Sequence, residues 1–465
     1  MNLLCGAKYS YGVVVFFVIC MLILASLSTE TNGFSMKLMP RNSIDSTLFP
    51  KNISAEEMHY RIVQLSQLRV LQLRSTSLSS HTPNTPNYNL SAFRASVGRG
   101  PANLYVVKLS IGSIMYSPYL LLDTSFDDTW VQCQACTTCF PLKGGGFEHH
   151  KSQTFQACSC YHPLCSPQDC SIDDVCSYNL TYTGGSITSG IYGADTLSFP
   201  TNSSNATIKL PNVVFGCGLD NINITFGGQM GSENEIAGVF GLGLGKRSIL
   251  KQLEYHTQLR FSYCLPSWTG TFGTHTWFRV GHDAQISGDS ERKVYTVDLI
   301  SRFNKYYVYV SGITFANTLL PINPSTFKPK SDGTGGFIID SSVGPTLLVK
   351  EAYEVLKYQV VEYFSRYGWV PESGKKTPYD ICYKFSLPNA TLSSMNINFE
   401  GGAQLLLSPD NVFQRVDNLL CLIFMPTYLD GVNLLGAFQQ ANHRFLFDVK
   451  TSKLSFVVEK CQDNS

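Results

Sequence analysis

The stretches Leu120-Leu121-Leu122-Asp123-Thr124-Ser125 and Phe337-Ile338-Ile339-Asp340-Ser341-Ser342 decide the fold of this chain. Each is typical of a buried strand that ends in a carboxylate, a hydroxyl residue and a small residue. They lie 217 residues apart, in the two halves of the chain. Either stretch alone is also typical of a strand that runs into an ordinary turn. Because the pattern occurs twice, we interpret it as one motif used twice, with two loops that meet face to face.

Two carboxylates that meet in a partly dry cleft cannot both ionise easily, so one of them keeps a proton. Such a pair can hold one water molecule, remove its proton and protonate a leaving group. The sequence therefore predicts Asp123 and Asp340 as a catalytic pair for hydrolysis. This chemistry requires no metal and no organic cofactor.

Length and charge limit the other possibilities. A chain of 465 residues is too long for one core, so two lobes are expected, and a formal net charge of +1 argues against nucleic acid as the main partner. The charge is unevenly spread, with eight basic and three acidic residues in 34–99 but 26 basic and 30 acidic residues in 100–465. We expect the basic front segment to contact the acidic body, and acid to weaken that contact.

The first residues are typical of a targeting segment. Lys8 precedes an apolar run over 13–24, and small residues follow, which predicts a signal peptide over 1–28. An uncleaved signal anchor is the alternative. We expect secretion to the extracellular space (the apoplast in a plant), with the vacuole as a second destination, and no stable membrane insertion once the signal is removed.

Cysteines and glycosylation sequons agree with that compartment. Thirteen of the 15 cysteines lie beyond the signal, enough for six disulfides and one thiol. Cys133, Cys136 and Cys139 have spacing that also allows zinc, but oxidation to disulfides is favoured in a secreted chain. Seven sequons occur, at Asn52, Asn89, Asn179, Asn202, Asn205, Asn223 and Asn389.

The organisation along the chain is that of a zymogen. Ser54 and Glu57 form a capping-box signature that opens a predicted helix over 54–74, and a Ser-, Thr-, Pro- and Asn-rich linker follows over 75–102. We expect a basic prosegment and linker over 29–99, although a plain N-terminal arm would share these features. From Tyr105 onward period-two patterns predict a mostly β body, and only 350–366 is convincingly helical.

Several stretches together resemble one known family. The run from Val107 to Gly112 and the run from Leu122 to Cys133 resemble the first active-site region of plant nepenthesin-type aspartic proteases, which belong to the pepsin-like peptidases. The run from Tyr182 to Gly190 resembles the flap of that family. Further matching stretches are 215–218, 237–243, 261–265, 336–341 and 435–448, and the prosegment over 34–74 is also similar. The resemblance covers nearly the whole chain after the signal.

The resemblance implies a bilobal pepsin-like fold, mostly β, with the cleft between an N-terminal lobe over 100–285 and a C-terminal lobe over 286–465. It implies that Val239-Phe240-Gly241 and Leu434-Leu435-Gly436 brace the two Asp loops. Tyr182, Thr124 and Ser341 complete the implied substrate-binding set, the last two by cross-bracing the loops. It also implies a monomer acting on polypeptides, and an unpaired thiol at Cys158, the cysteine beyond the family's twelve.

Four positions depart from the family pattern. Ser125 and Ser342 stand where the family has Gly, and Phe126 and Val343 stand where it usually has a hydroxyl residue. A Cβ in place of Gly costs energy if φ is positive there. Losing the two outer hydroxyls removes hydrogen bonds to the ionised carboxylates, so we expect raised apparent pKa values for the pair.

Two functions are compatible with these residues. The first is an aspartic endopeptidase that is active at acid pH, with Asp123 and Asp340 exchanging the roles of base and acid while Tyr182 closes over the peptide. The second is a weak or inactive pepsin-like protein that binds or inhibits other proteins, such as cell-wall glycoside hydrolases. Retention of both aspartates favours the first function, and the four departures favour the second.

Overall fold

The computed structural model describes most of the chain after its first 32 residues. The described residues are 33–41, 53–78, 104–182, 185–200, 207–226, 234–267, 276–302, 304–331, 334–374, 376–385, 392–427 and 432–461. The predicted signal peptide, nearly all of the predicted linker, and Thr183 and Gly184 of the predicted flap lie outside them. Within the described residues, no helix has the length and apolar character needed to cross a membrane.

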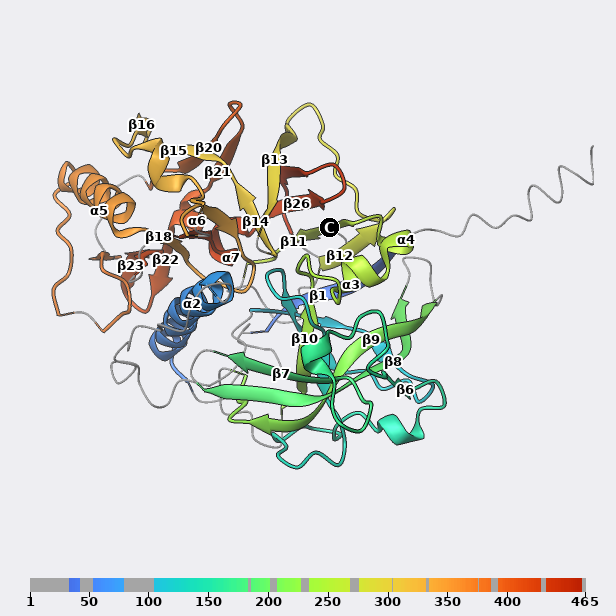
Figure 1. The fold of residues 1–465 in the computed structure, drawn as a ribbon. Coiled ribbons are helices and arrows are strands. Elements are labelled where there is room, and N and C mark those ends of the chain that lie inside the picture. Colours follow the sequence, from blue (N-terminus) through green and yellow to red (C-terminus); the bar gives the residue numbers. More distant parts are fainter. Residues whose placement is uncertain are drawn as a thin grey trace, which may run out of the picture.

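Strands dominate both halves of the chain, which confirms the mostly β, bilobal prediction (Figure 1). The first half contains β1 (Gly33–Pro40), β2 (Tyr105–Lys108), β3 (Ser110–Ile111), β4 (Tyr119–Asp123), β5 (Trp130–Gln132), β6 (Gln156–Ala157), β7 (Ser177–Tyr182), β8 (Ser186–Pro200), β9 (Thr207–Ile222), β10 (Ile236–Gly241), β11 (Arg260–Cys264) and β12 (Thr276–Gly281). The second half contains β13 (Tyr295–Arg302), β14 (Lys305–Val308), β15 (Val310–Phe315), β16 (Thr318–Leu319), β17 (Phe337–Ile339), β18 (Thr346–Leu348), β19 (Cys382–Lys384), β20 (Met395–Phe399), β21 (Gln404–Leu407), β22 (Phe413–Val416), β23 (Leu419–Leu422), β24 (Phe424–Pro426), β25 (Asn433–Leu435), β26 (His443–Asp448) and β27 (Lys453–Val458). The α-helices are α2 (Ala55–Leu78), α3 (Ile249–Gln252), α4 (Glu254–Thr257), α5 (Lys350–Ser365), α6 (Pro409–Val412) and α7 (Ala437–Gln440).

The two aspartate stretches are built alike, as the repeated motif predicts. β4 runs parallel to β10, with Asp123 opposite Gly241, and β17 runs parallel to β25, with Ile339 opposite Leu435. The glycines at the C-terminal ends of the bracing strands are required for close approach. A Cβ at Gly241 would lie 2.7 Å from the carbonyl oxygen of Asp127, and one at Gly436 would lie 2.6 Å from that of Pro345.

One strand of the predicted prosegment forms part of the body. β1 lies between β12 and β2, and pairs antiparallel with both of them. Phe34, Met36 and Leu38 on this strand are fully buried, and the Phe34 ring stacks on Phe199 with centroids 4.0 Å apart. Apolar burial of this kind stabilises the folded chain. The first part of the predicted prosegment is therefore a central strand of the sheet in this structure.

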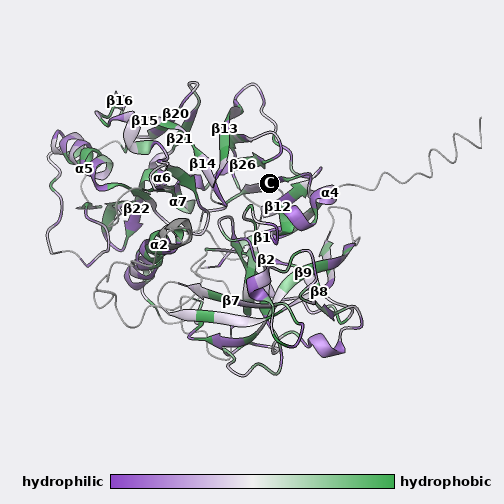
Figure 2. Cartoon of the chain, in the orientation of Figure 1, coloured by the Kyte–Doolittle hydropathy of each residue, from purple (hydrophilic) through white to green (hydrophobic). Residues whose placement is uncertain are grey.

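The predicted helix over 54–74 is α2, and Ser54 caps it by accepting a hydrogen bond from the Glu57 amide over 3.1 Å. Figure 1 shows α2 between the lobe that carries α5, β18 and β22 and the lobe that carries β7 to β9. Figure 2 shows that α2 carries both hydrophilic and hydrophobic residues. Its buried apolar residues are Met58, Ile62, Val63, Leu65, Val70 and Leu73. The helix predicted over 350–366 is α5, and it ends one residue earlier.

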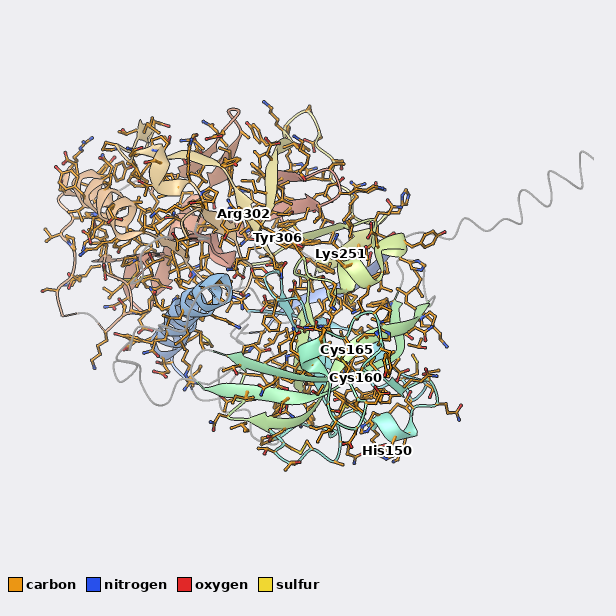
Figure 3. The ribbon with its side chains drawn as sticks, in the orientation of Figure 1. His150, Cys160, Cys165, Lys251, Arg302 and Tyr306 are labelled. Carbon is orange, nitrogen blue, oxygen red and sulfur yellow. A yellow bond between two sulfur atoms is a disulfide. The ribbon has the colours of Figure 1, made fainter. Side chains whose placement is uncertain are left out.

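The cysteines of the described residues form six disulfides. They are Cys133–Cys217, Cys136–Cys139, Cys160–Cys170, Cys165–Cys176, Cys264–Cys461 and Cys382–Cys421. Figure 3 labels Cys160 and Cys165 in the first lobe. Cys158 is buried and unpaired, as expected from the resemblance. The Cys133 and Cys217 sulfurs lie near His149, but they are bonded to each other and are not free thiolate ligands for zinc.

Candidate active site

The two aspartate loops meet at the boundary between the lobes. Asp123 and Asp340 are buried, with 1% and 0% of their surfaces exposed. The Thr124 Oγ1 and Ser341 Oγ atoms are 3.4 Å apart, and the Ser341 amide donates to Thr124 Oγ1 over 3.4 Å. The loops are therefore cross-braced by these hydroxyl residues, and the sequence motif separated by 217 residues is brought to one place.

A single guanidinium joins the two carboxylates. Arg69 of α2 donates from Nη2 to Asp123 Oδ1 over 2.5 Å and from Nε to Asp340 Oδ2 over 3.0 Å. Nε and Nη2 belong to one rigid planar group, so the two carboxylates lie close enough to hold one small group between them. In this structure that group is the side chain of Arg69, which lies between the two carboxylates.

The electrostatics of this cluster favour the charged forms. Burial disfavours the charge on Arg69, but the Asp123 and Asp340 carboxylates outweigh it and raise the pKa of Arg69. Burial likewise disfavours ionised Asp340, yet the charge of Arg69 and hydrogen bonds from Ser342 lower the pKa of Asp340 below its usual value. With α2 in place, Asp340 is therefore held as a carboxylate.

Val343 lacks the hydroxyl that was expected beside Asp340, but Ser342, one residue earlier in the chain, supplies one. Ser342 donates to Asp340 Oδ1 from its amide over 2.9 Å and from its Oγ over 2.5 Å. The expected rise in pKa is therefore wrong for Asp340 in this form of the protein. The expected backbone cost does not arise either, because neither Ser125 nor Ser342 has a positive φ. Around Asp123 the outcome differs, because the buried Ser125 Oγ has no hydrogen-bond partner among the described residues.

We predict that Ser342→Ala raises the lower apparent pKa of the aspartate pair by about one to two pH units, since a hydrogen bond to an ionised group contributes roughly 1.5–3 kcal/mol. The sign follows from the contact, because loss of a donor to the carboxylate makes its protonation easier. The measurement is the pH dependence of peptide cleavage by the acid-treated variant, whose acidic limb should move to higher pH. Ser125→Ala is the matched control and should leave that limb in place. An unmoved limb in Ser342→Ala contradicts the assigned role.

The predicted flap residue, Tyr182, lies near Asp123 and Arg69. Tyr182, at the end of β7, is buried, and its hydroxyl accepts a hydrogen bond from Trp130 Nε1 over 2.8 Å. Phe126, which replaces a hydroxyl residue of the family, stacks on Tyr182 with ring centroids 5.7 Å apart. Stacked aromatic pairs add stability beyond their buried area. Phe126 therefore packs against the flap, while Asp123 remains in contact with Arg69.

α2 contacts the second lobe along its length. His59 Nδ1 is hydrogen-bonded to the Tyr379 hydroxyl over 2.8 Å, Gln67 Nε2 donates to the Pro426 carbonyl over 2.8 Å, and Ser66 Oγ accepts from the Gly344 amide over 3.1 Å. These contacts place the helix across the loop that follows Asp340. The site is therefore covered by a helix that both lobes hold.

Comparisons with known proteins match most of the chain. A family model described as Xylanase inhibitor N-terminal matches residues 105–275, and one described as Xylanase inhibitor C-terminal matches residues 305–457. Aspartic proteinase nepenthesin-1 of Nepenthes gracilis is 31% identical over 438 residues, which cover 93% of this chain and 91% of that relative. This chain belongs to the plant nepenthesin-type family of pepsin-like proteins. Nepenthesin-2 of the same plant is 28% identical and spans 88% of this chain and 87% of its own length.

Solved structures support the pepsin-like fold of this nepenthesin-type chain. The structure titled "Crystal structure of edgp" has a TM-score of 0.61 at 17% identity and covers 77% of this chain and 93% of its own. The structure of basic 7S globulin from soybean has a TM-score of 0.60 at 20% identity, and it covers 79% of this chain and 97% of its own. At these identities the likeness shows the fold alone.

Sequence reasoning identified the aspartates of this family but missed Arg69. Ile62, Ser66, Arg69 and Leu73 recur at helical spacing, and all four are buried in the structure. The signal available in the sequence was a charged residue on a helical face whose other members are uncharged. An opposite charge is needed to stabilise such a residue, and the aspartate pair supplies it.

Sequence reasoning also missed Asp127, which links the two lobes of this nepenthesin-type protein beside the pair Asp123 and Asp340 (the dyad). Asp127 Oδ1 accepts from the Gly245 amide over 2.6 Å, and its Oδ2 accepts from Asn304 Nδ2 over 2.8 Å, across the lobe boundary. Tyr306, labelled in Figure 3, crosses the same boundary by donating to the Leu242 carbonyl over 2.7 Å. Burial raises the pKa of Asp127 to about 6. These contacts fix the position of one aspartate loop relative to the other lobe.

Proposed function

We propose that this chain is the proenzyme of an aspartic endopeptidase that hydrolyses peptide bonds at acid pH. The observation that carries the proposal is that Asp123 and Asp340, from two separate loops, contact adjacent nitrogens of the one Arg69 guanidinium. Carboxylates placed this close share a proton once the cation leaves. The aspartic protease names of the relatives support the same chemistry.

The mechanism follows from the contacts of each carboxylate. With Arg69 gone, a water held between Asp123 and Asp340 loses a proton to the ionised member and attacks the peptide carbonyl, while the protonated member donates to the departing amine. The Ser342 hydroxyl favours the ionised form on Asp340, so the shared proton resides more on Asp123. Tyr182 and Phe126 cover the site and exclude bulk solvent during the reaction.

In the proposed cycle α2 is an inhibitory segment. It fills the space over both aspartates, so substrate and helix exclude each other. Acid weakens the attachment of α2. The pKa of Asp340 is lower with the helix docked than without it, so ionised Asp340 stabilises docking at pH values above the pKa of the uncovered carboxyl. This stabilisation is lost as the pH falls through the lowered pKa of the docked form. The six disulfides agree with maturation in an oxidising compartment, which is where we place the enzyme as a secreted protein.

We predict that His59 contributes to this acid release. Burial against the second lobe lowers the pKa of His59 to about 4, whereas a free histidine titrates near 6.5. His59 is therefore protonated only below about pH 4 while the helix is docked, but already near pH 6.5 once the helix is released. As the pH falls from 6.5 to 4, the free energy of docking becomes less favourable by about 3 kcal/mol in all. His59→Gln should shift the pH midpoint of activation downward by roughly half to one pH unit.

The measurement is the pH at which half of the full-length chain gains activity within a fixed time. His150→Gln is the matched control, because His150 is exposed and Figure 3 shows it in the first lobe, away from α2. Equal midpoints for His59→Gln and the unsubstituted chain would remove His59 from the release step.

The experiment that tests the proposed function is cleavage of a denatured protein by the acid-treated chain between about pH 3 and pH 5, with and without a pepstatin-like inhibitor. We expect cleavage that the inhibitor abolishes. Correctly folded, acid-processed protein that cleaves nothing over this range would overturn the proposal.

A second candidate function is binding to another protein without catalysis. The family models that match this chain carry the name Xylanase inhibitor, and the four departures beside the aspartates agree with relaxed catalytic constraint. A glycoside hydrolase such as a xylanase is the partner to test. Inhibition of a xylanase together with absent peptide cleavage would favour this candidate. The retained aspartates and the Ser342 hydroxyl bond favour the enzyme.

A further inference from the structure

One glycosylation sequon lies on the strand that ends at the predicted flap tyrosine. The sequon Asn179-Leu180-Thr181 is part of β7, and Asn179 precedes Tyr182 by three residues. Side chains alternate between the two faces of a strand. Asn179 and Thr181 are accordingly exposed on the outer face, while Tyr178 and Tyr182 are buried on the inner one. A substituent on Asn179 would therefore lie outside the core.

The side-chain amide of Asn179 is free to carry such a substituent, because it makes no hydrogen bond within the described residues. Asn223 is the other sequon asparagine in the described part of the chain. It donates from Nδ2 to the Gly185 carbonyl over 3.4 Å, and its backbone has a φ of 55°. The other five sequons, at Asn52, Asn89, Asn202, Asn205 and Asn389, lie outside the described residues.

A polar hollow of about 390 Å³ lies beside Asn179. It is lined by Gln168 and Asp169 of the short 3₁₀-helix η3 (Pro167–Asp169), and by Ser177, Asn179 and Ser189 of β7 and β8. Ser189 is directly opposite Asn179 in the register of these two strands, so the asparagine stands at the hollow itself. Hydroxyl, amide and carboxylate groups are hydrogen-bond partners for the hydroxyl groups of a sugar.

Covalent and hydrogen bonds hold the two walls of this hollow together. Cys176, the residue before β7, is bonded to Cys165, which lies two residues before η3. Ser177 Oγ also donates to the Asp169 carbonyl over 2.9 Å. A hollow that is already formed costs little conformational freedom when a ligand enters it.

We propose that Asn179 carries an N-linked glycan whose first sugar, an N-acetylhexosamine, lies in this hollow. The donor is the lipid-linked oligosaccharide of the secretory pathway. In the transfer the Asn179 amide nitrogen bonds to C1 of the sugar and loses a proton, while the bond from C1 to the lipid diphosphate breaks and the diphosphate leaves with the electron pair. The sugar then restrains β7, the strand that carries Tyr182. This inference depends on the secretion proposed above and not on peptidase activity.

The first test measures the occupancy of Asn179 in the full-length chain secreted by a eukaryotic host, by mass spectrometry after release of glycans with a peptide amidase in heavy-oxygen water. We expect most molecules to be modified at Asn179. Thr181→Ala should abolish the modification, whereas Thr181→Ser keeps the sequon and should retain it. Asn223→Gln is the control and should leave the occupancy of Asn179 unchanged.

The second test measures amide hydrogen exchange over 167–170 and 177–182 in the same preparations. Both segments should exchange about threefold to tenfold faster in Thr181→Ala than in Thr181→Ser, because the sugar contacts η3 as well as β7. Release of the glycan from the folded, unsubstituted chain should give the same increase. That comparison separates the effect of the sugar from the effect of the substitution.

Two results would overturn the inference: an unmodified Asn179 in a secreted, disulfide-bonded chain, or a modified Asn179 with unchanged exchange in both segments after the glycan is released. A chain retained in the cytosol with reduced cysteines would overturn the proposed secretion and this inference together. Neither readout uses peptide cleavage, so a failure of the proposed peptidase function would be seen separately.

Discussion

Asp340→Asn and Asp123→Asn should each reduce peptide cleavage by the acid-treated chain at least about a thousandfold. The dyad works only if one member accepts a proton from water while the other donates one, and an amide does neither. Both residues are buried at the point where the loops meet, and both contact the same guanidinium. The measurement is kcat/KM on a denatured protein or peptide library at the pH optimum of the unsubstituted chain.

Asp298→Asn is the matched control, since Asp298 is an exposed aspartate that pairs with Lys453 on the surface. It should retain full activity. Thermal unfolding and intact disulfides in the dyad variants establish that the loss is catalytic and not a folding defect. Residual activity near that of the unsubstituted chain in either dyad variant would show that these aspartates are not the catalytic pair.

Arg69→Ala should move the pH midpoint of activation upward by about one to two pH units. Removing one partner of a buried ion pair costs about 3–5 kcal/mol when the remaining charge stays unpaired. Here the cost is smaller, because the two freed carboxylates can share a proton. Without Arg69 the helix keeps contacts such as those of Gln67 and Ser66, and these give no preference for the ionised dyad.

The measurement is binding of a pepstatin-like inhibitor to the full-length chain as a function of pH, which reports access to the dyad without requiring turnover. Arg61→Ala is the matched control, because Arg61 lies on the same helix and, among the described residues, pairs with Glu57 one turn away. Arg69→Lys should fall between the two, since an ammonium retains the charge but lacks two nitrogens in a fixed plane. An Arg69→Ala midpoint equal to that of the control would show that the guanidinium does not hold the helix in place.

The sequence predicted the parts of the fold that depend on local pattern. The two apolar runs that end at Asp123 and Asp340 are strands, and the capped helix over 54–74 is α2. The family resemblance implied the cross-bracing of Thr124 and Ser341 and the unpaired Cys158, and the structure has both. The predicted signal peptide, the lobe boundaries and the destination of the chain stay predictions.

The chemistry of the site required contacts between distant residues. In the sequence, Ser342 replaces a glycine of the family pattern and Val343 replaces a hydroxyl residue. Only the folded loop shows that the Ser342 Oγ donates a hydrogen bond to Asp340. Likewise Arg69, Asp123 and Asp340 come from three separate segments, and nothing in their spacing says that one guanidinium reaches both carboxylates.

By itself the sequence determined which residue types are present and which local structures they form, because helix caps and strand periodicity act between neighbours in the chain. The tertiary structure alone decided which charges meet in the cleft. Burial and distance set the strength of a charge interaction, and both are properties of the packed lobes. The aspartates were therefore visible in the sequence, whereas the cation that restrains them became visible only in the fold.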